Sequence, residues 1–142
     1  MKIRNLSSSD YQYIISIVDD WWGGRQMTGL LPKLFFDHFQ DTSFVIQESD
    51  KIVGFLIGFL SQSKKDEAYI HFVGIDPCFR KQGFGKMLYQ YFFDDVRKKG
   101  AHFVRCITSP LNKLSISYHK KMGFLIEDGD RYMDGVSVHS NY

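Results

Sequence analysis

The most constraining feature of the sequence is a glycine-rich segment between a strand pattern and a long helical pattern. It reads FRKQGFGKMLYQYFF over residues 79–93 and follows the β-favouring run EAYIHFVGID. Gly83 and Gly85 open a helical pattern that runs to Lys99 and ends at Gly100. Its expected apolar side comprises Met87, Leu88, Tyr91, Phe92 and Val96. A glycine-rich loop that opens a helix predicts an anion site, because the first N–H groups of a helix lack internal acceptors.

Two common phosphate motifs do not fit this segment. A P-loop requires Ser or Thr after its lysine, but Met87 follows Lys86. A dinucleotide fingerprint requires a third glycine at the position of Leu88, and it belongs to the first strand–helix unit of a domain. At this point a plain turn without a ligand remains the alternative for Gly83 and Gly85.

The other patterns predict one α/β domain over residues 1–142. They indicate a strand, two helices, three strands, a helix, a strand, a helix and a strand over residues 2–6, 7–22, 32–39, 43–49, 51–62, 67–76, 83–99, 102–108, 111–122 and 124–130. Ser8 or Ser9 is the expected cap of the first helix. This order predicts a mixed, mostly antiparallel central sheet of six or seven strands flanked by about four helices.

Composition excludes several classes of protein. A net charge of +2 is too small for a nucleic-acid-binding surface, whose affinity comes from dense phosphate neutralisation. The longest apolar stretch, Ile52–Leu60, is too short for a bilayer, and the N-terminus lacks a signal-peptide core, so no membrane partner is expected. Cys78 and Cys106 match no metal or redox spacing. We therefore expect no metal, two unpaired thiols, with a disulfide between them as the alternative, and a cytoplasmic protein.

Two spaced motifs resemble the GCN5-related N-acetyltransferase (GNAT) superfamily. Its acyl-coenzyme A loop follows the pattern Arg/Gln-x-x-Gly-x-Gly/Ala after a strand that ends Val-x-Pro. Here residues 75–77 read IDP and residues 80–85 read RKQGFG. The family's second signature is an Asn followed eleven residues later by Gly-Phe, and here Asn112 precedes Gly123 and Phe124. The element order is similar to that of the family over most of the chain.

The resemblance implies acetyl-coenzyme A as the co-substrate. In the family, the loop amides hold the pyrophosphate and the preceding strand bonds the pantetheine arm as a surrogate strand. The sheet is expected to splay between the strand that ends at Ile75 and the strand that starts near Phe103. The implied coenzyme-binding residues are Val73, Gly74, Ile75, Arg80, Lys81, Gln82, Gly83, Phe84, Gly85, Lys86 and Asn112.

The implied reaction is direct attack of a primary amine, on a small molecule or a peptide, upon the thioester. A base must deprotonate the ammonium, and an acid assists the leaving thiolate. The family usually places a tyrosine acid four residues before Gly123, where this chain has His119, with Tyr118 one place earlier. Both are candidate acids, and water is the alternative. His71 is expected to share a strand face with Val73 and is the candidate base, unless it is a buried structural histidine.

The acceptor pocket implied by the family includes the end of the first helix. Trp21, Trp22 and Arg25 are the candidate acceptor-binding residues, although one tryptophan could pack in the core and Arg25 could be solvated. At best a short strand can follow Asp130, so either a small strand of this chain ends the sheet or a partner supplies one. An unpaired sheet edge would favour a homodimer. A non-catalytic acyl-coenzyme A-binding or sensing module, or an enzyme for longer acyl chains, is the alternative function.

Overall fold

The computed structural model describes residues 1–108, 117, 119–121, 123–128 and 136–141. Seven strands form one sheet in the order β1-β2-β3-β4-β5-β7-β6. The strands are β1 (Lys2–Asn5), β2 (Phe44–Glu48), β3 (Lys51–Leu60), β4 (Glu67–Ile75), β5 (Phe103–Thr108), β6 (Leu125–Asp128) and β7 (Val136–Asn141). The α-helices of the described residues are α1 (Tyr11–Trp21), α2 (Lys33–His38) and α3 (Phe84–Lys98).

The predicted fold class is confirmed. Neighbouring strands pair antiparallel except for β4 and β5, which are parallel and are connected through α3. Ser49 lies in the turn between β2 and β3 with a φ of 56°. Gly100 follows α3 with a φ of 97°, as expected of a residue that ends a helix. The helix predicted over 111–122 falls mostly outside the described residues, of which 117 and 119–121 are helical.

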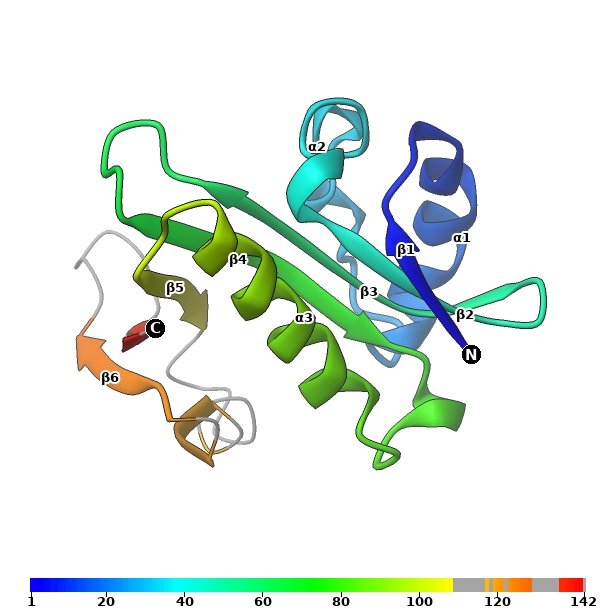
Figure 1. The fold of residues 1–142 in the computed structure, drawn as a ribbon. Helices are drawn as coiled ribbons and strands as arrows, with labels where there is room; N and C mark the ends of the chain where they lie inside the picture. Colours follow the sequence, from blue (N-terminus) through cyan, green and yellow to red (C-terminus); the bar gives the residue numbers. More distant parts are fainter. Residues whose placement is uncertain (109–116, 118, 122, 129–135, 142) are drawn as a thin grey trace.

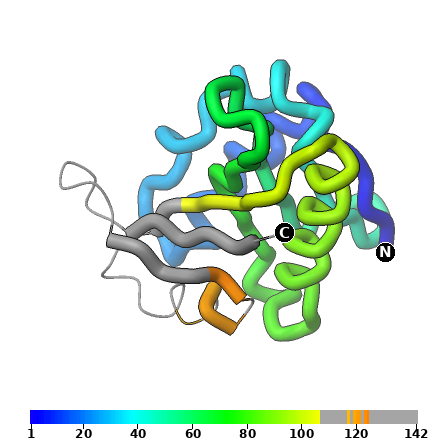
Figure 2. The backbone as a smooth tube through the Cα atoms, turned by 60° about the vertical axis from the view of Figure 1, so that its left-hand side comes forward, coloured from blue at the N-terminus to red at the C-terminus, as the bar shows by residue number. Residues whose placement is uncertain are grey.

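The helices divide between the two faces of the sheet. Figures 1 and 2 show α3 on one face and α1 and α2 on the other. Leu88, Phe92 and Val96 of α3 are buried in one hydrophobic cluster with β3 and β4. Ile14 and Val18 of α1 belong to a second cluster on the opposite face. Strands β2, β3 and β4 therefore contribute buried side chains to both faces of the sheet, as expected of an α/β sandwich.

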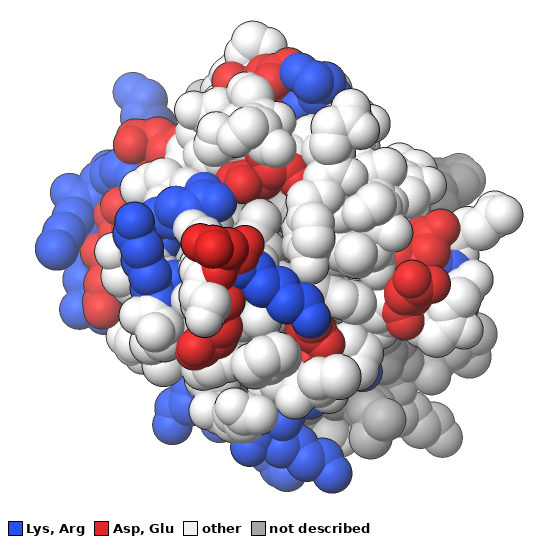
Figure 3. Space-filling model, turned by 90° about the vertical axis from the view of Figure 1, so that its right-hand side faces the viewer, with Lys and Arg blue, Asp and Glu red and all other residues white. Residues whose placement is uncertain are grey.

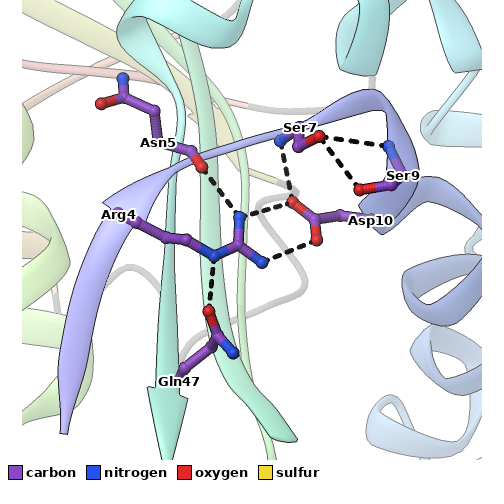
Figure 4. Close-up of polar contacts among 6 residues, drawn as sticks. All are labelled: Arg4, Asn5, Ser7, Ser9, Asp10 and Gln47. Atoms are coloured by element: carbon purple, nitrogen blue, oxygen red, sulfur yellow. Dashed lines mark hydrogen bonds and ion pairs between the residues drawn. The ribbon is translucent and has the colours of Figure 1, made fainter. Parts of the chain in front are cut away.

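The start of α1 is tied to β1 by charge and by a cap. Ser7, rather than the predicted Ser8 or Ser9, caps the turn that leads into α1, and Asp10 accepts back from the backbone N–H of Ser7. Arg4 donates to both carboxylate oxygens of Asp10, at 2.9 and 2.8 Å (Figure 4). This hydrogen bonding raises the pKa of Arg4. Because Asp10 is buried, its charge requires this bidentate partner.

β4 changes its pairing half-way along its length. Between Ile57 and Gly58 the β3–β4 register shifts, and His71 is left without a partner on β3. Pairing with β5 also ends there, because Ile70 is the last β4 residue with a β5 partner. The predicted splay is therefore present, and it begins at a β-bulge.

The bulge corrects the expected faces of β4. Val73 packs with the cluster on the α3 side, whereas the ring of His71 stacks on Phe35 of α2. The prediction that His71 and Val73 share a face is wrong. An extra residue in one strand reverses the alternation of side chains beyond it, and simple period-two counting fails across it.

The buried side of α3 is also rotated from its expected position. Tyr89 and Phe93 are buried, at 4% exposure each, whereas Tyr91 is 45% exposed. The spacing of Leu88, Tyr89, Phe92, Phe93 and Val96 follows the helical period at least as well as the predicted set. The choice between the two sets is decided by contacts with the sheet. As a result, α3 presents Tyr89 to the interior.

The chain supplies its own final strand. β7 lies between β5 and β6 and pairs antiparallel with both. A short final strand from the chain itself was one of the expected endings, and β7 matches it. Dimerisation itself stays a prediction.

The surface is mixed in charge. On the face drawn in Figure 3, lysine and arginine side chains alternate with aspartate and glutamate. Within the described part of the chain, no helix has the length and apolar character needed to cross a bilayer.

Candidate functional site

A cavity of about 590 Å³ lies between the unpaired half of β4 and the N-terminal end of α3. Its lining residues are Trp22, Val73, Ile75, Phe79, Arg80, Lys81, Gly83, Phe84, Gly85, Lys86, Tyr89 and His119. Most of the predicted site residues are therefore brought to one place. Gly74 and Gln82 are exceptions, because Gly74 is buried toward Trp22 and Phe55, and Gln82 is exposed outside the described lining.

The loop before α3 turns sharply at two positions. Lys81 has a φ of 64° and Gly83 a φ of 82°, so the chain twice adopts the left-handed region. Gly83 caps α3, and its carbonyl accepts from the N–H of Met87 at 3.0 Å. A Cβ placed on Gly83 would meet no protein atom within 4 Å. The space above this helix end is therefore open to a ligand, as an anion cradle requires.

The basic side chains of the loop have different positions. Arg80 is tied inward, because its guanidinium donates to the carbonyl of Trp21 at 2.6 Å and to that of Ile75 at 3.2 Å. Lys81 and Lys86 are exposed at the cavity. Arg80 thus joins the end of α1 to the end of β4, and Lys81 and Lys86 supply positive charge beside the start of α3. The helix dipole adds to that charge.

The unpaired half of β4 directs backbone groups toward the gap in the sheet. The N–H of Asp76 donates to the carbonyl of Val53 on β3 at 2.9 Å. Successive backbone groups of a strand point to opposite sides, so those of Gly74 face β3 and those of Val73 and Ile75 face the gap. No β5 residue in the described chain pairs with them. This edge is available to an extended ligand except at the carbonyl of Ile75, which accepts from Arg80.

A buried pair of titratable side chains forms one wall of the cavity. The hydroxyl of Tyr89 lies 2.8 Å from Nε2 of His119, and the two side chains belong to residues that are only 4% and 6% exposed. The pair is enclosed by aromatic rings, since Phe124 contacts both of them edge-on. The expectation that His119 reaches the site is met in position. Its role as an acid stays a prediction.

The sequence patterns did not identify Tyr89 as a residue of the site. The expected apolar side of the helix included Leu88 and Tyr91 but not Tyr89. The spacing of Gly85, Tyr89, Phe92 and Val96 along α3 is a signal that could have indicated it, because it places Tyr89 one turn below the loop. Only the fold brings His119 to the same point.

His71 lies elsewhere. Its Nε2 is hydrogen-bonded to the carbonyl of Leu30, and its ring stacks on Phe35 with centroids 4.3 Å apart. The described lining of the cavity does not include it. The role of His71 as a base stays a prediction, and it requires a path from this ring to the cavity.

The three candidate acceptor-binding residues lie in different environments. Trp21 is buried against Phe55, whereas Trp22 follows the end of α1 and lines the cavity. The alternative that one tryptophan packs in the core is therefore correct for Trp21. Arg25 is exposed in the next loop and is absent from the described cavity lining.

Two predicted residues, Asn112 and Tyr118, lie outside the described residues. The two cysteines form no disulfide, and burial raises the pKa of Cys106 to about 12. Its thiol is therefore almost entirely protonated near neutral pH, which makes it a poor nucleophile. Among the described residues, no group of three His, Cys, Asp or Glu side chains is placed to bind a metal ion.

Comparison with known proteins agrees with this geometry. Residues 6–124 match the Acetyltransferase (GNAT) family. The chain belongs to the GNAT family. The match begins before α1 and ends at Phe124, so it includes the loop, α3 and His119.

Two curated relatives of this GNAT protein have named activities. L-2,4-diaminobutyric acid acetyltransferase from Shouchella clausii is 27% identical over 86 residues, which are 61% of this chain and 48% of that protein. Ribosomal protein bS18-alanine N-acetyltransferase from Escherichia coli is 26% identical over 82 residues, 58% of this chain and 53% of that protein. The chain spans about half the length of the curated relatives it matches.

A solved structure shows the same fold over nearly the full chain. Diaminobutyrate acetyltransferase from Paenibacillus lautus, in complex with L-2,4-diaminobutyric acid and coenzyme A, matches with a TM-score of 0.76. The match covers 99% of this chain and 93% of that chain at 20% sequence identity. At this identity the likeness shows the fold.

Proposed function

We propose that this chain is an N-acetyltransferase that moves an acetyl group from acetyl-coenzyme A to a primary amine by direct attack. The observation that carries the proposal is one cavity that joins an open anion cradle, a free strand edge and a buried titratable pair. An acyl-coenzyme A combines an anionic end with a peptide-like arm, and these two features match the cradle and the strand edge.

The loop holds the anionic end of the co-substrate in this proposal. The N–H groups of residues 81–86 supply donors around Gly83, where the structure leaves room above the backbone. Lys81 and Lys86 neutralise the charge, while Arg80 keeps the loop fixed against α1 and β4. Asn112 is proposed to bind near the pantetheine arm.

The gap-facing backbone groups of Val73 and the N–H of Ile75 bind the peptide-like arm, while the carbonyl of Ile75 is held by Arg80. Bound acetyl-coenzyme A supplies an activated acetyl thioester at this edge. A backbone N–H directed into the gap stabilises negative charge that develops on the carbonyl oxygen. Direct transfer is supported by Cys106, whose thiol is buried and protonated, and by Cys78, which lies before the loop and outside the described cavity lining.

The acceptor is proposed to be a primary amine of a small molecule or a peptide. The two curated relatives are named for acceptors of these two kinds. Trp22 lines the cavity at the end of α1 and presents an aromatic face that can hold a cationic or apolar group. Arg25, exposed in the following loop, is proposed to contact an anionic group of the acceptor.

The proposed compartment is the cytoplasm. Cys78 is exposed and unpaired, which agrees with a reducing environment.

The cradle is tested by Gly83→Val. We expect the dissociation constant for coenzyme A, measured by titration calorimetry, to rise by about 10- to 100-fold, because the side chain enters the space above the loop and the φ of 82° is strained for valine. Gly29→Ala is the control, since a Cβ at Gly29 also meets no protein atom within 4 Å but lies far along the chain. Unchanged affinity in folded Gly83→Val contradicts the cradle.

Catalysis is tested by release of free thiol from acetyl-coenzyme A with a panel of primary amines. We expect at least one amine to accelerate thiol release above the rate with water. Tight binding of coenzyme A without acceleration by any amine contradicts the enzyme and favours a binding module.

A further inference from the structure

Tyr89 and His119 form a buried contact in the lining of the cavity. Both residues line the cavity, and each sits in a wall built from a different part of the chain. Tyr89 belongs to α3, six residues after Gly83, which places it about 9 Å along the helix from the anion cradle. Among the described cavity-lining residues, the other titratable groups are the loop cations.

We propose that Tyr89 is the terminal proton donor of the site and that His119 resupplies it. The inference rests on the proposed acetyl transfer. The hydroxyl of Tyr89 contacts Nε2 of His119 at 2.8 Å, so a proton that leaves Nε2 along this contact passes to the phenol oxygen. A phenol has an ordinary pKa of about 10 and an imidazole one of about 6.5, so near neutral pH an imidazolium readily reprotonates a phenolate.

The balance of the step is simple. The amine nitrogen forms a bond to the carbonyl carbon of the acetyl group, the carbon–sulfur bond of the thioester breaks, and the sulfur keeps the electron pair of the broken bond. Tyr89 Oη releases its proton to that sulfur, and Nε2 of His119 returns a proton to Oη. His119 ends the step one proton poorer and regains it from solvent, while the proton lost by the amine goes to water.

The enclosure of the pair supports a role beyond packing. Tyr89 and His119 are nearly inaccessible to solvent, and Phe124 contacts both rings. A buried hydroxyl–imidazole contact is strengthened by the low local polarity and fixes the ring orientation. A tyrosine needed only to fill space here could be a phenylalanine, which would keep the rings and remove the contact.

The first test is spectroscopic and needs no co-substrate. Histidine labelled with ¹⁵N reports the proton on each ring nitrogen of His119. We expect Tyr89→Phe to shift the Nε2 resonance of His119 in the free protein. The control is Tyr91→Phe, which removes a hydroxyl from the exposed side of the same helix and should leave that resonance unchanged. An unchanged resonance in Tyr89→Phe overturns the proposal.

The second test separates turnover from binding. We expect Tyr89→Phe to lower kcat about 10- to 100-fold with less than threefold change in the dissociation constant of coenzyme A. His119→Gln should lower kcat similarly, and the double variant should be no worse than either single variant, because the residues act as one unit. Tyr91→Phe is the control and should keep the wild-type kcat.

The outcomes distinguish this inference from the proposed function. If the wild type accelerates thiol release but Tyr89→Phe does so equally well, the proposed role of Tyr89 as proton donor is wrong, while the proposed acetyltransferase activity is still supported. Losses in kcat that multiply in the double variant also overturn it, because independent structural effects add in free energy. If the wild type releases no thiol with any amine, the proposed function fails and this inference fails with it.

Discussion

The two halves of β4 show how one strand can serve both the core and the site. From Ala68 to Ile70 it pairs with β3 on one side and with β5 on the other. From Phe72 to Ile75 it keeps β3 and loses β5. The first half is a structural strand, and the second half presents backbone groups to the cavity. The bulge at His71 separates them, so a local irregularity creates the open edge.

The largest effect is expected from a substitution in the half of β4 that has no β5 partner. Val73→Pro removes one N–H that faces the gap. The hydrogen bonds between β4 and β3 are made by the residues on either side of Val73, so the substitution does not remove them. We expect kcat/KM for acetyl transfer to fall about 100-fold relative to Val73→Ala, the size observed when one donor to a developing oxyanion is lost. Steady-state thiol release measures it.

Val73→Ala is the matched control, because it shortens the same side chain and keeps the N–H. Thermal unfolding of both variants checks that the sheet survives. Equal activity of the two variants would show that the backbone of Val73 has no role, and the contrast between the halves would then be structural only.

The next effect tests the paired half. Gly58 pairs with Ile70, and a Cβ on Gly58 would lie 2.4 Å from the ring of Phe92 and 3.0 Å from the carbonyl of Tyr69. We expect Gly58→Ala to lower the free energy of unfolding by about 2 kcal/mol, because the buried ring must move. Urea denaturation measures the change.

Gly29→Ala serves as the control for Gly58→Ala, because its Cβ meets nothing within 4 Å, and it should change the free energy of unfolding by less than about 0.5 kcal/mol. Under conditions where Gly58→Ala is folded, its kcat should stay near the wild-type value. A large kcat loss with unchanged stability would mean that the paired half also belongs to the site.

The smallest expected effect concerns His71, at the boundary of the two halves. Its ring stacks on Phe35 and bonds the carbonyl of Leu30, away from the described cavity lining. We expect His71→Gln to change kcat by less than about threefold, far less than His119→Gln, because the ring lies on the opposite face. A 100-fold loss in kcat would instead establish His71 as the base.

Much of the fold could be predicted from the sequence because these elements depend on local sequence patterns. The β2–β3 hairpin, the helix after Gly83 and the stop at Gly100 all follow from turn residues and periodicity. The coenzyme loop was predicted from two motifs far apart in the chain, and the family match agrees with that resemblance. The cap of the first helix was misplaced by one residue or more, since Ser7, Ser8 and Ser9 are chemically alike.

The faces of β4 could not be predicted in the same way. Period-two alternation assumes an uninterrupted ladder, and nothing in EAYIHFVGI marks His71 as the extra residue of a bulge. Gly58 lies opposite the bulge. The need for a glycine at this position is visible only in the tertiary structure, where the ring of Phe92 packs against it. In the same way, the burial of Tyr89, which is not on the expected apolar side of the helix, is decided only by its contacts in the folded protein.

The sequence by itself determined the order of elements, the glycine-rich loop and the presence of a histidine at position 119, because each of these depends on neighbours in the chain. The tertiary structure decided which side of α3 is buried, where β4 leaves β5, and that Tyr89 meets His119 at 2.8 Å. The physical reason is that these contacts join residues 30 or more positions apart, and only packing of the sheet against α3 selects them.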